Sequence, residues 1–219
     1  SPVPPPPVDL RVGSTTPTSR NRVSPARHVA MARVLEKARA FPALFPAALD
    51  ADTLSERDRR LAETIDRQVT MRWSTLRAFI EPHLKAAWDD QHPALITALM
   101  CGAAQMLLMD RIPDHAAIGQ SVEWCKSTPM RKASGVVNAV LRKIAATRQE
   151  RIEQADVNRD DHLLHADGSG WLLSRQVFAG SRVQRLARQT GCPRTLIERW
   201  TQQYDEDTAR HLALHALAQ

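Results

Sequence analysis

The side chains of this 219-residue sequence that could do catalytic chemistry are three cysteines and eight histidines. Cys101, Cys125 and Cys192 are odd in number and far apart, a spacing that fits neither a set of disulfides nor a zinc knuckle. Two of the three stand inside helical apolar patterns. We therefore expect buried free thiols, in a protein of the reducing cytoplasm, with no catalytic nucleophile among them.

Two histidine pairs have the spacing for metal binding but lack a complete ligand set. His162 and His165 are three residues apart, and His211 and His215 are four apart, so each pair could share one helix face. No third cysteine, histidine or carboxylate completes a metal signature around either pair. The sequence also lacks a Gly-x-Ser-x-Gly motif and a Ser-His-Asp order. We expect no metal site, no catalytic residue and no cofactor in this chain.

Basic residues are concentrated in two stretches. The formal charge of +6 includes +5 for residues 1–39, −3 for residues 40–128 and +5 for residues 129–151. If the fold brings the two basic stretches together, they form a surface for a polyanion, and arginine suits phosphate because its planar fork donates paired hydrogen bonds. From charge alone, a solvated face is the alternative. The candidate RNA-binding residues are Arg20, Arg22, Arg27, Arg33, Arg131, Lys132, Arg142 and Lys143.

Composition and periodicity predict an all-α fold. The chain has only 8 glycines and 5% aromatic residues, and strong helix formers dominate its periodic segments. The first 25 residues contain seven of the 14 prolines, which predicts a disordered tail over residues 1–24. Ser24-Pro25 is typical of a helix start. Residues 93–110 are apolar nearly all round, which predicts the central helix of a bundle.

Other segments are less regular. Residues 56–80 follow helical spacing, either as one helix or as two broken near Trp73. Residues 151–170 are polar and rich in Asp and His, and we interpret them as a linker before a helical segment over residues 171–219. Asn138 stands in a helical stripe, and we expect it to have a structural role in which its amide ties the helix to neighbouring backbone. No apolar run is long enough to span a membrane.

Two further expectations concern the apolar core. The helix that contains Asn138 should face inward with Val136, Val137, Val140, Leu141 and Ile144. The tryptophans should pack in the core rather than stack on bases, and they are Trp73, Trp88 and Trp124.

Four ordered sequence blocks resemble a known family. They are ARHVAMARVL near the start, then SERDRRLAETI, then ALMCGAAQMLLMDRIPDHAAIGQSVEWCK, and last GVVNAVLRKI. In this order they resemble the NusB family, in particular the NusB-like N-terminal region of the RsmB group of ribosomal RNA cytosine methyltransferases. The segment from Cys192 onward is similar to the helical stretch that leads into the catalytic domain of those enzymes, although Asp205 replaces a usual glycine.

The resemblance implies an all-α bundle of two packed helical halves over residues 25–150. It also implies RNA binding through the basic N-terminal region. It does not carry methyltransferase activity to this chain, because the glycine-rich strand-to-helix turn of an S-adenosylmethionine domain is absent. Cys192-Pro193 also reverses the Pro-Cys order of the family's nucleophile. S-adenosylmethionine would enter only if a catalytic domain follows Gln219, which stays open.

Three hypotheses follow. The first is a non-catalytic RNA-binding module, the N-terminal part or a solitary relative of a ribosomal RNA 5-methylcytosine methyltransferase. The second is a NusB-type transcription antitermination factor that binds RNA with a ribosomal protein. The third is a helical scaffold that binds only protein. We expect ribosomal RNA as partner, a ribosomal protein as a candidate second partner, no membrane, and a monomer or homodimer.

Overall fold

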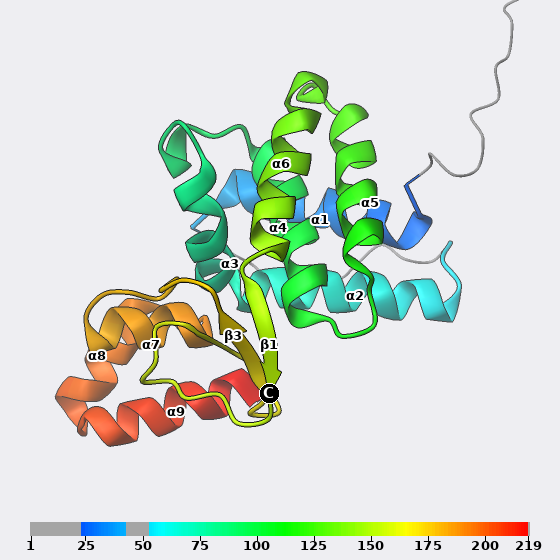
Figure 1. Ribbon diagram of the computed structural model, residues 1–219. Helices are drawn as coiled ribbons and strands as arrows, with labels where there is room; N and C mark the ends of the chain where they lie inside the picture. The colour runs from blue at the N-terminus through cyan, green and yellow to red at the C-terminus, as the bar shows by residue number, and fades with distance from the viewer. Residues whose placement is uncertain (1–22, 43–52, 219) are drawn as a thin grey trace, which may run out of the picture.

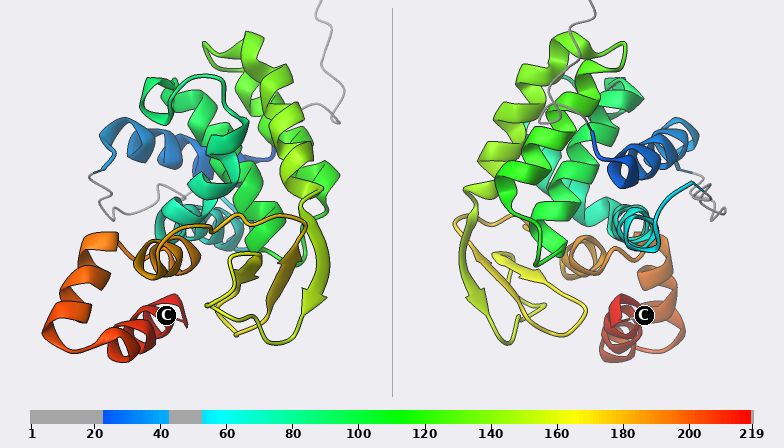
Figure 2. Two further views of the ribbon diagram at one scale, coloured as in Figure 1. Left: turned by 60° about the vertical axis from the view of Figure 1, so that its left-hand side comes forward. Right: turned by 90° about the vertical axis from the view of Figure 1, so that its right-hand side faces the viewer.

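The computed structural model describes residues 23–42 and 53–218. Arg20, Arg22 and nearly all of the expected N-terminal tail lie outside these residues. Helices α1 to α6 form a bundle, and a small sheet with α7 to α9 lies at one end of it (Figures 1 and 2). The elements are α1 (Pro25–Ala40), α2 (Glu56–Met71), α3 (Trp73–Ile80), η2 (Glu81–His83), η3 (Trp88–Asp90), α4 (Pro93–Leu108), α5 (Asp114–Lys126), η4 (Arg131–Ala133), α6 (Ser134–Ala145), β1 (Arg148–Ile152), β2 (His162–Leu164), β3 (Gly170–Leu173), α7 (Arg182–Thr190), α8 (Arg194–Gln203) and α9 (Glu206–Ala218).

Helix α4 is the centre of the bundle. All residues from Ala94 to Leu107 are buried, and α1, α2, α3, α5 and α6 pack around them. A Cβ at Gly102 would lie 2.5 Å from Leu141 Cδ1 and 2.8 Å from Ser121 Oγ, so glycine lets α5 and α6 approach closely. This confirms the prediction of an all-α bundle with a surrounded central helix. No described helix is long and apolar enough to cross a lipid bilayer.

The helix pattern over residues 56–80 breaks at Arg72. Ser55 caps α2 by accepting a hydrogen bond from the Asp58 amide. Arg72 then leaves helical geometry at φ −109° and ψ 25° and separates α2 from α3. Its side chain is 3% exposed and turns away from the bundle to reach the C-terminal part of the chain. The break therefore serves a long-range contact, which local periodicity could not reveal.

The segment interpreted as a linker contains regular structure instead. Strands β1, β3 and β2 form an antiparallel sheet in that order, with Trp171 of β3 opposite both Arg151 and Leu163. Leu163 is fully buried. The turn before β3 depends on Gly168, which has φ +84°. Apolar runs of two or three residues are too short to show a period, so the polar composition of the segment concealed these strands.

The C-terminal helices form where the sequence placed them. Ser181 and Gln184 make a capping box at the start of α7. Gly191 ends α7 at φ +82°, and a Cβ there would lie 2.0 Å from the Met71 carbonyl oxygen, so only glycine allows this approach to α2. Helices α7, α8 and α9 share a second apolar core with Val157 and Leu164, separate from the core of the bundle.

Two expectations for α6 need correction. Val137, Val140, Leu141 and Ile144 are buried, but Val136 is 45% exposed, because it lies about 100° around the helix from the middle of that stripe. Asn138 does not tie the helix to neighbouring backbone and instead accepts a hydrogen bond from Arg142. The three tryptophans expected in the core are buried, at 5% exposed for Trp73 and Trp88 and 3% for Trp124.

Candidate nucleic-acid interface

One groove brings together residues from both basic stretches of the sequence. The N-terminus of α1 supplies Arg27, the middle of the groove follows α5, and α6 supplies Arg142. The two arginines are 115 positions apart in the chain, and the bundle places both on the wall of one concave surface. The remaining lining residues are Ser24, Asp114, His115, Ala116, Ile118, Gly119, Gln120, Val122, Glu123, Asn138, Ala145 and Ala146.

Arg27 is held in position by a chain of polar contacts. Its Nε donates to Gln105 Oε1 at 2.6 Å, and its Nη1 donates to Ser24 Oγ at 3.2 Å. Gln105 is fully buried in α4 and donates to the Cys101 carbonyl oxygen at 2.8 Å. The amide of Ser24 in turn donates to Gln120 Oε1 at 2.7 Å, which joins the start of α1 to α5. The guanidinium is therefore oriented before any ligand arrives.

Arg27 carries a partly desolvated charge. Burial lowers its pKa from the usual arginine value, and it has no carboxylate partner among the residues that the structure describes. A cation that has lost part of its hydration without gaining a counter-ion interacts more strongly with an anion than a fully hydrated one does. The site at Arg27 is thus suited to a phosphate oxygen.

Arg142 lies on the other wall and is exposed. Its Nε donates to Asn138 Oδ1 at 3.2 Å, one helical turn earlier, and within the described ranges it makes no ion pair. The carboxylates of the groove are already paired elsewhere: Asp114 binds Arg148, and Glu123 binds Lys126 at 2.7 Å. Both arginines of the groove therefore keep an uncompensated charge, and the groove has a local excess of positive charge.

The other predicted residues that the structure describes lie apart from this groove. Arg131 and Lys132 are exposed on η4, in the turn between α5 and α6 (Figure 1). Arg33 is paired with Glu36 at 2.6 Å further along α1. Lys143 follows Arg142 in sequence but lies outside the groove. Burial, then the charges of Arg175 and Lys143, lower the pKa of His83 in η2. Arg20 and Arg22 fall outside the described residues.

A second basic feature was missed by sequence reasoning. Arg148 and Arg151 of β1 both lie over the indole of Trp171, at 5.0 and 5.5 Å from the ring centre. Residues three apart point to opposite faces of a regular strand, but the ladder is irregular between Arg148 and Glu150, which returns both arginines to one face. Because no pattern of residues indicates this bulge, sequence reasoning could not show that these arginines share a partner.

The cysteines and the histidine pair near the sheet take part in the packing of the described chain. All three cysteines are buried, as predicted, and burial raises the pKa of each thiol. In that same part of the chain, no three His, Cys, Asp or Glu side chains come close enough together to hold a metal ion. The histidine pair of the sheet serves structure: His162 accepts a hydrogen bond from the Asp156 amide, and His165 Nε2 lies 2.8 Å from the Leu107 carbonyl oxygen.

Comparison with known proteins identifies the family of the chain. Ribosomal RNA small subunit methyltransferase B of Yersinia pseudotuberculosis serotype O:1b (strain IP 31758) and that of Yersinia pestis bv. Antiqua (strain Angola) are each 28% identical to this chain over 146 residues. The match covers 67% of this chain but 32% of each relative, so it spans about a third of their length. No solved structure gave a significant match. The NusB family matches residues 26–146, more than half of the sequence, and the chain belongs to that family.

Proposed function

We propose that this chain is a non-catalytic RNA-binding module that holds structured ribosomal RNA by its phosphates. The observation that carries the proposal is the pair Arg27 and Arg142, which line one groove with no carboxylate partner in the described chain. Phosphate contacts of this kind fix the position of an RNA without reading its sequence. The module would present the RNA to a catalytic domain that methylates a cytosine at carbon 5, either attached to this chain or associated with it.

The relatives named for methylation of small-subunit ribosomal RNA support this assignment, since the shared region is the NusB part of the chain and the residues around it. The docking of residues 148–218 onto the bundle also supports it. Arg72 Nη2 donates to the carbonyl oxygens of Leu164 at 3.0 Å and Gln189 at 2.9 Å. A module that orients RNA toward a neighbouring domain needs such a rigid connection. We place this activity in the cytoplasm, where buried cysteines stay reduced.

The test is the affinity of the whole chain for a fluorescent small-subunit ribosomal RNA fragment, measured by anisotropy at low salt. Arg142→Gln is expected to weaken binding about fivefold, since a pair of unit charges 4 Å apart in water contributes about 1 kcal/mol. Arg60→Gln is the matched control, because Arg60 is 76% exposed on α2 and lies outside the groove. Equal affinities for these two variants, or no binding by the unmodified chain, would contradict the proposal.

A further inference from the structure

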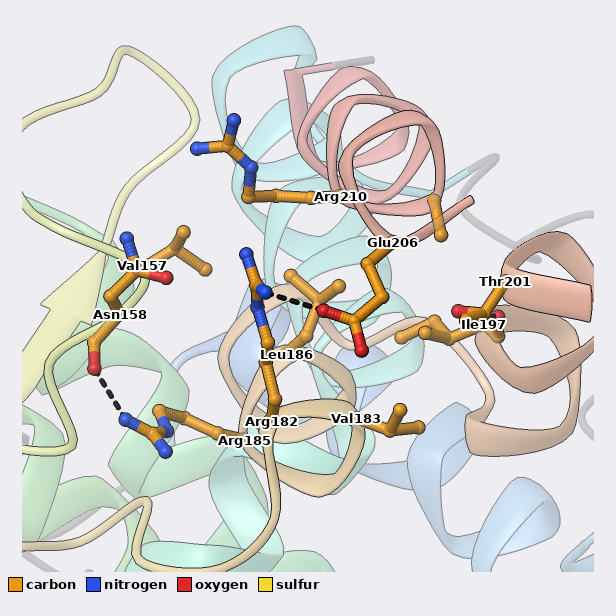
Figure 3. A pocket seen from close by; sticks show the side chains of 11 residues that line it. Val157, Asn158, Arg182, Val183, Arg185, Leu186, Ile197, Thr201, Glu206 and Arg210 are labelled. Atoms are coloured by element: carbon orange, nitrogen blue, oxygen red, sulfur yellow. Dashed lines mark hydrogen bonds and ion pairs between the residues drawn. The ribbon is translucent and has the colours of Figure 1, made fainter. Parts of the chain in front are cut away.

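The C-terminal part of the chain contains a separate basic pocket. It opens between the loop at Val157 and Asn158 and the helices α7, α8 and α9, and its volume is about 150 Å³ (Figure 3). The groove described above is formed by α1, α5 and α6, so the two sites share no residue.

Three arginines surround the pocket. Arg182 and Arg185 come from α7 and Arg210 comes from α9, and in Figure 3 the side chains of Arg185 and Arg210 extend toward the Val157–Asn158 loop from opposite sides. Glu206 is the single acidic residue among the residues that line the pocket, and it is paired with Arg182. Asp207, beside the pocket, lies 3.7 Å from Arg182 and 3.6 Å from Arg210, so three positive charges face two negative ones.

Two of these arginines have unused hydrogen-bonding capacity. Arg185 donates to the backbone oxygens of Asn158 and Gly180 and has no carboxylate partner in the ranges described. Arg210 makes only a long contact, 3.6 Å, with Asp207. The Nε atoms of Arg185 and Arg210 are buried and have no acceptor in the described chain. Buried donors without acceptors are costly. The partly exposed ends of both guanidinium groups remain open to an anion, whose charge would offset part of that cost.

The wall between the arginines is apolar. Val157, Val183, Leu186, Ile197 and Ala209 line it, with Ile197 and Ala209 each 1% exposed. An apolar wall beside cations fits a ligand with one flat apolar part and one anionic part. The volume is below the roughly 300–1,000 Å³ of sites that enclose a drug-sized ligand, so the pocket suits one small unit rather than a whole cofactor.

We propose that this pocket binds a single nucleotide unit, with the phosphate on Arg185 and Arg210 and the base against Val183, Leu186 and Ile197. Arginine forks match phosphate oxygens, and an apolar surface receives the face of a base. The choice of a nucleotide rests on the proposed RNA-binding function. The unit comes either from an unpaired residue of a bound RNA strand or from a free nucleotide, and both offer the same chemistry to the pocket.

The experiment is a nuclear magnetic resonance titration of the whole chain, observed at the methyl groups of Val183, Leu186 and Ile197. The probes are cytidine 5′-monophosphate, cytidine and a single-stranded oligocytidine. We expect the nucleotide to shift these methyl signals saturably, and cytidine to bind at least fivefold more weakly because it lacks the phosphate. Tighter binding of the oligocytidine with the same shifts assigns the site to an RNA strand, whereas binding of the mononucleotide alone assigns it to a free nucleotide.

Matched variants identify the arginines. Arg185→Gln is expected to weaken binding at least fivefold, and Arg210→Gln to act in the same direction. Arg199→Gln is the control, since Arg199 is exposed on α8 and does not line the pocket. The proposal is overturned if neither phosphate-containing probe shifts the methyl signals, or if cytidine binds as tightly as cytidine 5′-monophosphate. It is also overturned if Arg185→Gln and Arg199→Gln bind the nucleotide with the same affinity while the methyl spectrum of Arg185→Gln shows a folded protein.

Arg142→Gln separates this proposal from the function proposed above. If Arg142→Gln loses affinity for ribosomal RNA and the unmodified chain binds no nucleotide in the pocket, the pocket proposal is rejected and the proposal for the groove stands. If the nucleotide binds saturably in the pocket and Arg142→Gln has unchanged affinity for ribosomal RNA, the proposal for the groove is rejected and the pocket proposal stands.

Discussion

Arg72 links the helical bundle to the C-terminal part of the chain, and its replacement by methionine should destabilise the protein. Its Nε donates to Thr75 Oγ1 at 3.1 Å, and its Nη2 donates to the Leu164 and Gln189 carbonyl oxygens at 3.0 and 2.9 Å. The side chain is buried, and burial lowers its pKa from the usual arginine value to about 10. Methionine fills a similar volume but removes all three hydrogen bonds.

Two opposing contributions set the size of the effect. Each pH unit by which the pKa is lowered corresponds to about 1.4 kcal/mol, so burial of this charge costs about 3 kcal/mol, which methionine would recover. Each hydrogen bond from a charged donor contributes about 1.5–3 kcal/mol, so three of them contribute about 5–9 kcal/mol. The hydrogen bonds outweigh the desolvation cost, and Arg72→Met should lower the free energy of unfolding by about 2–6 kcal/mol.

Unfolding in urea, monitored by tryptophan fluorescence, measures this loss. Arg60→Met is the control, because a substitution at an exposed helix position should change the free energy of unfolding by less than about 0.5 kcal/mol. Native-state hydrogen exchange adds the location: amides of β2 and α7 should lose protection before those of α4. An unchanged or higher stability of Arg72→Met would mean that desolvation outweighs the hydrogen bonds, and the reasoning above would be wrong.

Three further results are expected. Lys37→Met should cost about 3 kcal/mol of unfolding free energy, measured in urea, because Lys37 Nζ lies 2.7 Å from both carboxylate oxygens of Asp66 and its loss leaves that half-buried acid without a cation. The free energy of unfolding should fall as the pH drops below about 6.5, because burial lowers the pKa of His165. In that range the unfolded chain binds a proton that the native state does not bind. The pH dependence should therefore be weaker in His165→Gln. A disulfide reagent should leave the thiols unmodified in the native protein and label all three in urea, because burial raises the pKa of Cys101 and of the other two; rapid native labelling would show that the packing around them is wrong.

The bundle was predictable because its information is local. Residues 93–110 are apolar on every side, and a helix of this kind has only one place in a globular protein. Ser55 and Ser181 mark helix starts by the hydrogen bonds that their hydroxyls accept, so their role also follows from neighbouring residues. The sheet was not predictable, because β1, β2 and β3 are held together by pairing between residues that are distant in sequence and by short apolar runs.

The candidate sites divide in the same way. Arg27 and Arg142 could be named from charge, but their meeting in one groove depends on the packing of α1, α5 and α6. The contact of Gln105 with Arg27 joins residues 78 positions apart and could not be derived from spacing, whereas the contact of Asn138 with Arg142 follows the i,i+4 spacing of α6. Arg185 and Arg210 come from two helices with no shared pattern, so only the packing of α7 against α9 shows that they share a pocket.

The most direct test of the central claim is the salt dependence of ribosomal RNA binding by the whole chain and by the double variant Arg27→Gln/Arg142→Gln. Each phosphate contact releases counterions, so the logarithm of the association constant should fall linearly with the logarithm of salt concentration. Loss of two contacts should make that slope shallower by about 1.4–1.8, since each contact contributes about 0.7–0.9. An identical slope for both proteins, or an affinity that does not change with salt, would contradict RNA binding by this groove.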